Sequence, residues 1–144
     1  MIQISISNLT QETIYPRVLQ TIEDICDQYQ LNREFGFIST ACQEIVEHLF
    51  GYHPGFSVDM DVFVESTEMS FVFTSHTAVF ADIMDHYDEE NILKDLSDRV
   101  DISSDHKSVN LTFHVKTHHK VLRNMPQEEQ VYQKFNIDDE LENN

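Results

Sequence analysis

Alternation of apolar and polar residues marks four segments of the chain, and this pattern limits the folds open to it. Residues 56–64 alternate throughout except at Phe63, and residues 69–73 repeat the pattern after a short polar connection. Residues 2–6 and 109–115 alternate in the same way. Because successive side chains of a strand point to opposite faces, each segment predicts a strand with one buried and one solvated face. Residues 56–64 and 69–73, which are separated only by a short connection, predict a β-hairpin.

Apolar residues at helical spacing fill most of the stretch between the first strand and the hairpin. Polar residues 8–13 suit a helix start, and the spacing after them predicts a regular helix from about Pro16 to Gln30. A second helix is predicted from Asn32, which can serve as its N-cap, to about Gly51. The sequence therefore predicts two consecutive helices, each with one apolar face.

A shorter helix is predicted over residues 91–100, followed by a strand near residues 101–103. The expected element order is β-α-α-β-β-α-β-β, with helices on one face of the sheet and water on the other. This predicts an α+β fold: a two-layer α/β sandwich with a mixed, largely antiparallel sheet and helices on one face. We expect one domain over residues 1–116 and a polar, acidic, partly flexible C-terminal tail over residues 117–144.

Acidic residues outnumber basic ones, with 26 Asp and Glu against 9 Lys and Arg and a formal net charge of −17. This excess disfavours nucleic acid and anionic membranes as main partners, because phosphate binding depends on clustered positive charge. No stretch approaches the roughly 20 apolar residues of a membrane span, and the alternating start does not resemble a signal peptide. We therefore expect a cytoplasmic protein, in which Cys26 and Cys42 on the predicted helices are buried, reduced thiols.

The second predicted helix contains the stretch Glu44-Ile45-Val46-Glu47-His48, and the hairpin follows it. Here the chain resembles the ATP-binding domain of the GHKL superfamily, which includes gyrase, histidine kinases and the anti-sigma-factor serine kinases. That family carries a helix with Glu, three residues and then Asn, so His48 stands at the Asn position. Residues 92–104 and 109–115 look like the final helix, strand, turn and strand of the anti-sigma-factor kinases. The resemblance covers about residues 1–116.

The resemblance implies site roles for five residues. Glu44 stands where the family Glu orients or deprotonates a water or a serine hydroxyl, and His48 stands where the Asn oxygen binds magnesium. Imidazole is a poor substitute there, because magnesium prefers hard oxygen ligands. The family's adenine-binding motif, Asp-x-Gly-x-Gly, corresponds to Ser75, Thr77 and Val79, so a weaker acceptor and β-branched side chains replace the carboxylate and the glycines.

A second glycine-rich motif lines the phosphates in the family, and Asp88-Glu89-Glu90-Asn91 occupies its place here. Three carboxylates at that place would repel a triphosphate. Every glycine of the nucleotide signature is missing. The resemblance therefore implies a GHKL-type fold that has lost ATP binding or holds it only weakly, with a vestigial Glu44 and no cofactor.

The resemblance also implies a function. We expect a regulatory protein without catalysis that works by partner switching and binds a sigma factor or a STAS-type antagonist. The alternative is an active ATP-dependent serine/threonine kinase of the same type with an atypical pocket, which would use ATP and magnesium. A third reading is an unrelated acidic α/β sandwich that only shares the element order. A homodimer is compatible with the resemblance, because related domains often pair.

Two further features have plainer interpretations. Glu44 and His48 can be a pair on the helix surface, and Glu44, His48 and His53 could in principle bind zinc. Their spacing is not a recognised zinc signature, so no metal site is predicted. The acidic run at residues 82–90 is typical of a solvated face, and less often of a docking surface for a basic partner.

Overall fold

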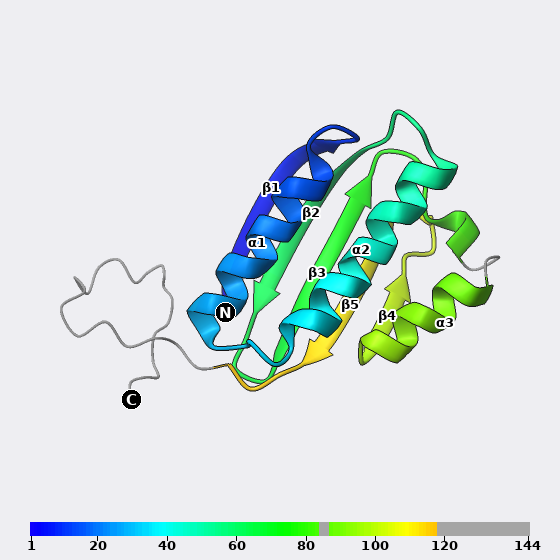
Figure 1. Cartoon of the computed structure of the whole chain (residues 1–144). Coiled ribbons are helices and arrows are strands. Elements are labelled where there is room, and N and C mark those ends of the chain that lie inside the picture. Colours follow the sequence, from blue (N-terminus) through cyan, green and yellow to red (C-terminus); the bar gives the residue numbers. More distant parts are fainter. Residues whose placement is uncertain (84–86, 118–144) are drawn as a thin grey trace.

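A five-stranded antiparallel sheet forms one layer of the fold, and the described helices pack against one of its faces (Figure 1). This computed structural model describes residues 1–83 and 87–117. The strand order is β1-β2-β3-β5-β4, and no parallel pair occurs among the described strands. The predicted two-layer α+β sandwich is thereby confirmed. The elements are β1 (Ile2–Thr10), α1 (Ile14–Tyr29), α2 (Phe35–Tyr52), β2 (Ser57–Val64), β3 (Glu68–Ser75), the 3-10 helix η1 (Ala81–Ile83), α3 (Tyr87–Leu96), β4 (Arg99–Ile102) and β5 (Ser108–His114).

The predicted hairpin, β2–β3, lies at the centre of the sheet and provides much of the core. Phe71 of β3 is fully buried and lies in register between Val62 of β2 and Leu111 of β5. Its ring meets that of Phe113 edge to face, with the ring centroids 5.8 Å apart. On the other face, most side chains of β2, β3 and β5 are exposed or half-buried, although Thr112 is fully buried. The apolar side chains of the alternating segments therefore lie on the face of the sheet that packs against the helices.

β1 extends beyond its predicted end because a bulge at Asn8 keeps the strand paired with β2. The register shifts between Ile6 and Leu9, and Asn8 adopts a positive φ of 62°, which asparagine tolerates better than most residues. The Asn8 N–H donates to Asp59 Oδ1 at 2.7 Å, and the Ser57 hydroxyl donates to Asn8 Oδ1 at 3.0 Å. Residues 8–10, which were expected to belong to the start of the helix, therefore belong to β1.

The turn between α1 and α2 is longer than predicted, and the N-cap assigned to Asn32 is wrong. Gln30 takes a left-handed conformation with a φ of 61°, and the Leu31 N–H then donates to the Cys26 carbonyl at 2.8 Å. Leu31 is 1% exposed, so it fixes the turn to the core. The Glu34 N–H donates to the Leu31 carbonyl at 3.1 Å, and Glu34 is the N-cap residue of α2. Asn32 is exposed within this turn.

The helix predicted over residues 91–100 runs too far, because α3 ends at Leu96 and β4 starts at Arg99. The Ser97 N–H and hydroxyl both donate to the Leu93 carbonyl, at 2.9 and 2.5 Å, and close the last helical turn. The Asp98 N–H then donates to the Thr112 carbonyl of β5 at 2.8 Å. This bond leads the chain into the sheet, so the end of the predicted helix belongs to β4.

Cys26 and Cys42 are buried and unpaired, as the sequence predicts. Burial raises the pKa of the Cys26 thiol to about 11, with a further contribution from the charge of Glu34, and burial also raises the pKa of Cys42. Because the thiolate is the reactive form, we expect both thiols to react very slowly with Ellman's reagent at pH 8. In guanidinium chloride both should react at the rate of free cysteine. Equal rates in the folded and unfolded protein would contradict this burial.

The expected acidic tail over residues 117–144 lies outside the described residues except for Thr117. The Thr117 N–H donates to the Ser66 carbonyl at 3.2 Å, next to the turn between β2 and β3. Among the described helices, none has both the length and the apolar composition that a membrane crossing requires.

Candidate functional site

The segment that follows β3 packs against the C-terminal half of α2, and the residues matched to the GHKL nucleotide motifs lie in these two places. Ser75 is the last residue of β3. Its hydroxyl donates to the Ser57 carbonyl at 3.2 Å and accepts the Thr77 N–H at 3.3 Å. Thr77 is exposed. The Ser75 hydroxyl, at the adenine-binding position of the family, is therefore engaged in closing the turn after its own strand.

Side chains of the protein fill the next part of this segment. Val79 is 6% exposed, Phe80 is fully buried, and the Phe80 N–H donates to the His106 carbonyl at 3.2 Å. On the facing helix His48 is 2% exposed, and its Nε2 lies 3.3 Å from the Val79 carbonyl oxygen. Glu44 lies one turn before His48 and is half-buried. A buried valine and a buried imidazole therefore occupy the positions that the resemblance matches to a glycine and to a magnesium-binding amide.

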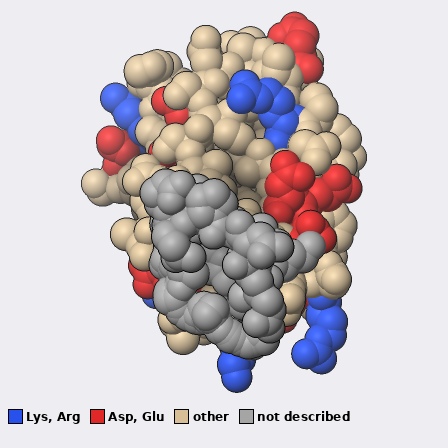
Figure 2. All heavy atoms as spheres, turned by 90° about the vertical axis from the view of Figure 1, so that its left-hand side faces the viewer, with Lys and Arg blue, Asp and Glu red and all other residues tan. Residues whose placement is uncertain are grey.

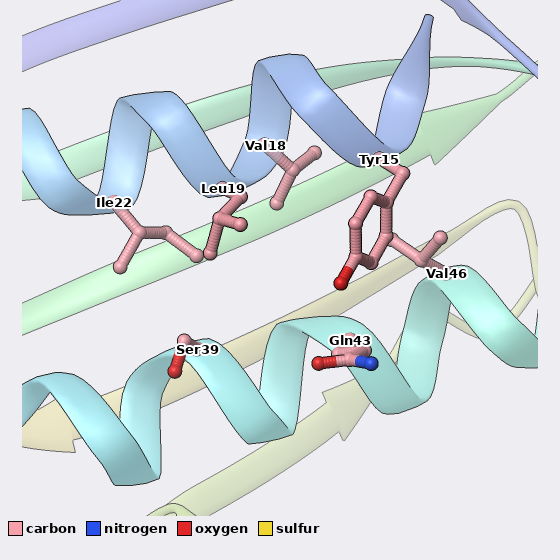
Figure 3. Close-up of a pocket in the computed structure, with 7 residues that line it drawn as sticks. All are labelled: Tyr15, Val18, Leu19, Ile22, Ser39, Gln43 and Val46. Carbon is pink, nitrogen blue, oxygen red and sulfur yellow. The ribbon is translucent and has the colours of Figure 1, made fainter. Parts of the chain in front are cut away.

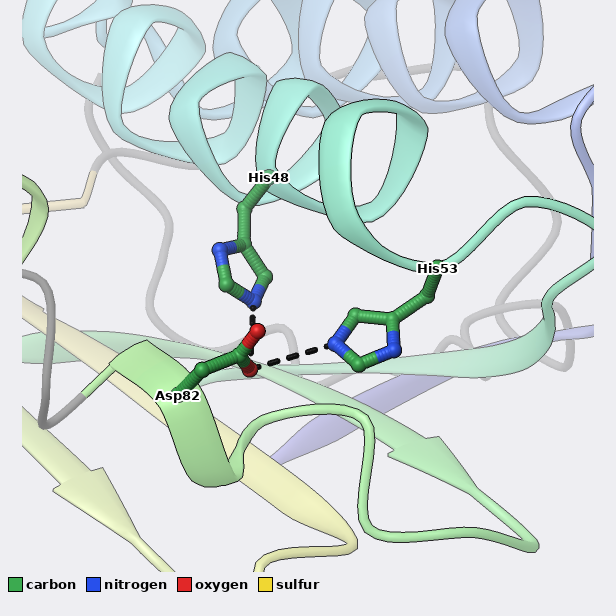
Figure 4. Close-up of side chains that lie close together, drawn as sticks. All are labelled: His48, His53 and Asp82. Carbon is green, nitrogen blue, oxygen red and sulfur yellow. Dashed lines mark hydrogen bonds and ion pairs between the residues drawn. The ribbon is translucent and has the colours of Figure 1, made fainter.

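His48, His53 and Asp82 bring their polar atoms together at the end of α2, as Figure 4 shows. The His48 Nε2 lies 3.2 Å from Asp82 Oδ1, and the His53 Nε2 lies 3.1 Å from the same oxygen. The three atoms that could bind a metal all lie within 4.8 Å of one another. The His53 and Asp82 side chains are 26% and 28% exposed, whereas that of His48 is 1% exposed. The cluster therefore has a buried end and an end open to water.

The charge on Asp82 is stabilised by its neighbours. Partial burial alone would raise the pKa of the Asp82 carboxyl, but the hydrogen bond from His53, a backbone hydrogen bond and the charges of His48 and His53 outweigh it. The pKa therefore lies below the ordinary value of 3.8. Two imidazole N–H groups can both donate to a carboxylate oxygen, and the same three groups form a zinc-type ligand set once both Nε2 atoms are deprotonated.

The sequence analysis identified two members of this cluster and missed the third. It grouped His48 and His53 with Glu44, which is not a member of the group that the structure brings together. Asp82 lies 29 residues beyond His53 and was interpreted only as part of an acidic run. No local sequence pattern identifies Asp82. It reaches the end of α2 only through the path that the chain takes after β3, which places η1 there.

The lowered pKa of Asp82 predicts how the stability of the cluster depends on pH. A carboxyl whose pKa is lower in the folded state stabilises the fold above its ordinary value of 3.8 and loses this contribution as the pH falls below it. In EDTA at pH 6, we expect Asp82→Asn to unfold at a lower urea concentration than the wild-type protein. The difference should shrink between about pH 4 and pH 2. A difference that is constant over this range would show that the charge of Asp82 contributes nothing.

A shallow groove lies between α1 and α2 (Figure 3). Its lining is mostly apolar, and Tyr15 at its edge is 46% exposed. The lining residues are Tyr15, Val18, Leu19, Ile22, Ser39, Gln43 and Val46.

Acidic side chains gather on the face of the molecule that includes the β1 edge of the sheet, with basic side chains beside them (Figure 2). The exposed residues of α1 include Glu23, Asp24 and Asp27. This distribution agrees with the net charge of −17. It favours basic over acidic macromolecules as partners.

Comparisons of the sequence with protein-family models and with curated proteins give no match. The resemblance to the GHKL superfamily therefore depends on the element order and on the motif positions described above.

Proposed function

We propose that this chain is a regulatory protein of the GHKL type, similar to the anti-sigma-factor kinases, which acts through protein partners without using ATP. One observation supports this most strongly. The helix and loop positions matched to the nucleotide motifs contact each other directly, with the His48 Nε2 3.3 Å from the Val79 carbonyl oxygen. A protein that keeps this scaffold but fills its nucleotide positions has lost the means of phosphotransfer and retains surfaces that can bind another protein.

The proposed partner is a sigma factor or a STAS-type antagonist. The chemistry of the surface favours a partner that offers apolar side chains flanked by basic ones, because an apolar groove lies on α1 and α2 and α1 also carries exposed acidic residues. Binding should then weaken as ionic strength rises, since opposite charges on the two surfaces are screened by salt.

Titration calorimetry with purified sigma factors and STAS-domain proteins encoded in the same genome tests this proposal. We expect saturable binding to one of them, with the same affinity in the presence and absence of Mg-ATP. Tyr15→Asp, which places a charge at the edge of the groove, should weaken this binding, whereas Phe37→Asp should not. Phe37 is a suitable control because it is 58% exposed and does not line the groove.

A phosphotransfer assay separates this proposal from the alternative of an active kinase. With radiolabelled ATP and the STAS-domain proteins, we expect no labelled serine. Transfer of the γ-phosphate that is abolished in Glu44→Gln would overturn the proposal and establish the kinase. Absence of binding to every sigma factor and STAS-domain protein tested would also overturn it.

A further inference from the structure

The side-chain cluster at the end of α2 has the composition of a transition-metal site. His48 and His53 come from the last part of α2 and the residue after it, and Asp82 comes from η1. Each contributes one ligand atom, and the two imidazoles point towards the carboxylate in Figure 4. Asp82 lies 29 residues beyond His53, so the fold, and not helical spacing alone, brings the carboxylate to the two imidazoles.

The spacing of the ligand atoms is close to that of tetrahedral zinc. Bonds of about 2.0–2.2 Å at tetrahedral angles separate neighbouring ligand atoms by about 3.3–3.6 Å. Asp82 Oδ1 lies 3.2 Å from the His48 Nε2 and 3.1 Å from the His53 Nε2. The remaining separation, between the two Nε2 atoms, is within 4.8 Å. Small side-chain rotations can therefore bring all three atoms to bonding distance of one ion.

The donor set selects the kind of metal. Two imidazole nitrogens and one carboxylate oxygen suit zinc and neighbouring divalent transition metals, whereas magnesium and calcium prefer oxygen ligands alone. Three protein ligands leave a fourth position for water. The exposure of His53 and Asp82 gives an ion access from solvent, and the buried His48 provides a rigid third ligand.

We propose that His48, His53 and Asp82 form a binding site for Zn²⁺. The site is independent of the proposed function, because it needs neither ATP nor a protein partner. When zinc is bound, the lone pair on each Nε2 faces the ion, and the His48 Nε2 no longer donates to Asp82 or to the Val79 carbonyl. The ion would then link α2 to η1 in place of these hydrogen bonds. It would stabilise the packing of the segment after β3 against α2.

Metal titration of the full chain tests this site. The protein is prepared without a histidine tag, stripped with EDTA, and titrated with Zn²⁺ against a chromophoric chelator and with Co²⁺ by visible absorption. We expect one tight equivalent of zinc, a cobalt spectrum typical of tetrahedral coordination, and a higher melting temperature in zinc. His53→Ala and Asp82→Asn should each weaken zinc binding by at least about 10-fold and remove the rise in melting temperature.

His76→Ala is the matched control, because His76 is exposed and lies outside the cluster. It should bind zinc as the wild-type protein does. Circular dichroism of each metal-free variant checks that the fold is kept, and His53 and Asp82 are partly exposed, so their substitution spares the core. Absence of tight zinc binding, or binding that either cluster variant leaves unchanged, would overturn the proposed ligand set.

Discussion

Replacing Phe71 with alanine is expected to lower the free energy of unfolding by about 3–5 kcal/mol. Phe71 is fully buried in the central strand β3, between Val62 and Leu111, and its ring contacts that of Phe113 edge to face. The substitution removes this aromatic pair and leaves a cavity that strands paired on both sides cannot close. Urea denaturation followed by circular dichroism measures the loss.

Val72→Ala is the matched control for this substitution. Val72 is the next residue of the same strand, is half-buried, and points to the face of the sheet away from the helices. We expect it to cost about 1 kcal/mol or less. If Val72→Ala were as destabilising as Phe71→Ala, the assignment of the core to one face of the sheet would be wrong.

Replacing His48 with alanine is expected to lower the free energy of unfolding by about 2–4 kcal/mol in EDTA. His48 is 2% exposed, and its Nε2 faces both the Val79 carbonyl oxygen and Asp82 Oδ1. The substitution leaves a cavity. It also removes the imidazole that can donate a hydrogen bond to the Val79 carbonyl or to Asp82. Glu47→Ala on the same helix is the control and should change stability by about 0.5 kcal/mol or less, because Glu47 is exposed.

His48→Asn sharpens this experiment, because asparagine is the residue that the GHKL family has at the matched position. The shorter side chain cannot fill the space of the imidazole, so we expect lower stability here too. It should gain no affinity for Mg-ATP, because Thr77 and the buried Val79 still stand at the positions that the resemblance matches to the family's glycines. An Asn variant that keeps wild-type stability would contradict the expected contribution of the His48 side chain to the stability of the fold. An Asn variant that binds Mg-ATP would contradict the proposed loss of ATP binding.

The fold was predictable where side-chain burial follows a simple period. Alternation identified the hairpin and the last strand, and helical spacing identified α1 and α2. The boundaries that were wrong depend on hydrogen bonds to other strands, which the spacing of apolar residues does not encode. The bulge at Asn8 requires Asp59 and Ser57 from another strand, and the end of α3 requires the Asp98 bond to β5.

The site was predictable only in part. Helical spacing places Glu44 and His48 on one side of α2, but it does not determine what His48 contacts. Its partners, Val79 and Asp82, belong to a segment whose path after β3 is set by tertiary packing, including the bond from the Phe80 N–H to the His106 carbonyl. The sequence shows Thr77 and Val79 at the positions matched to the family's glycines, but it does not show that the Val79 carbonyl faces His48.

Titration calorimetry of the untagged, EDTA-treated protein with Mg-ATP tests the central claim most directly. The closed contact between His48 and the Val79 carbonyl predicts no binding tighter than about 100 μM. Saturable binding below that concentration, weakened by substitution of Glu44 or Ser75, would contradict the proposed loss of ATP binding.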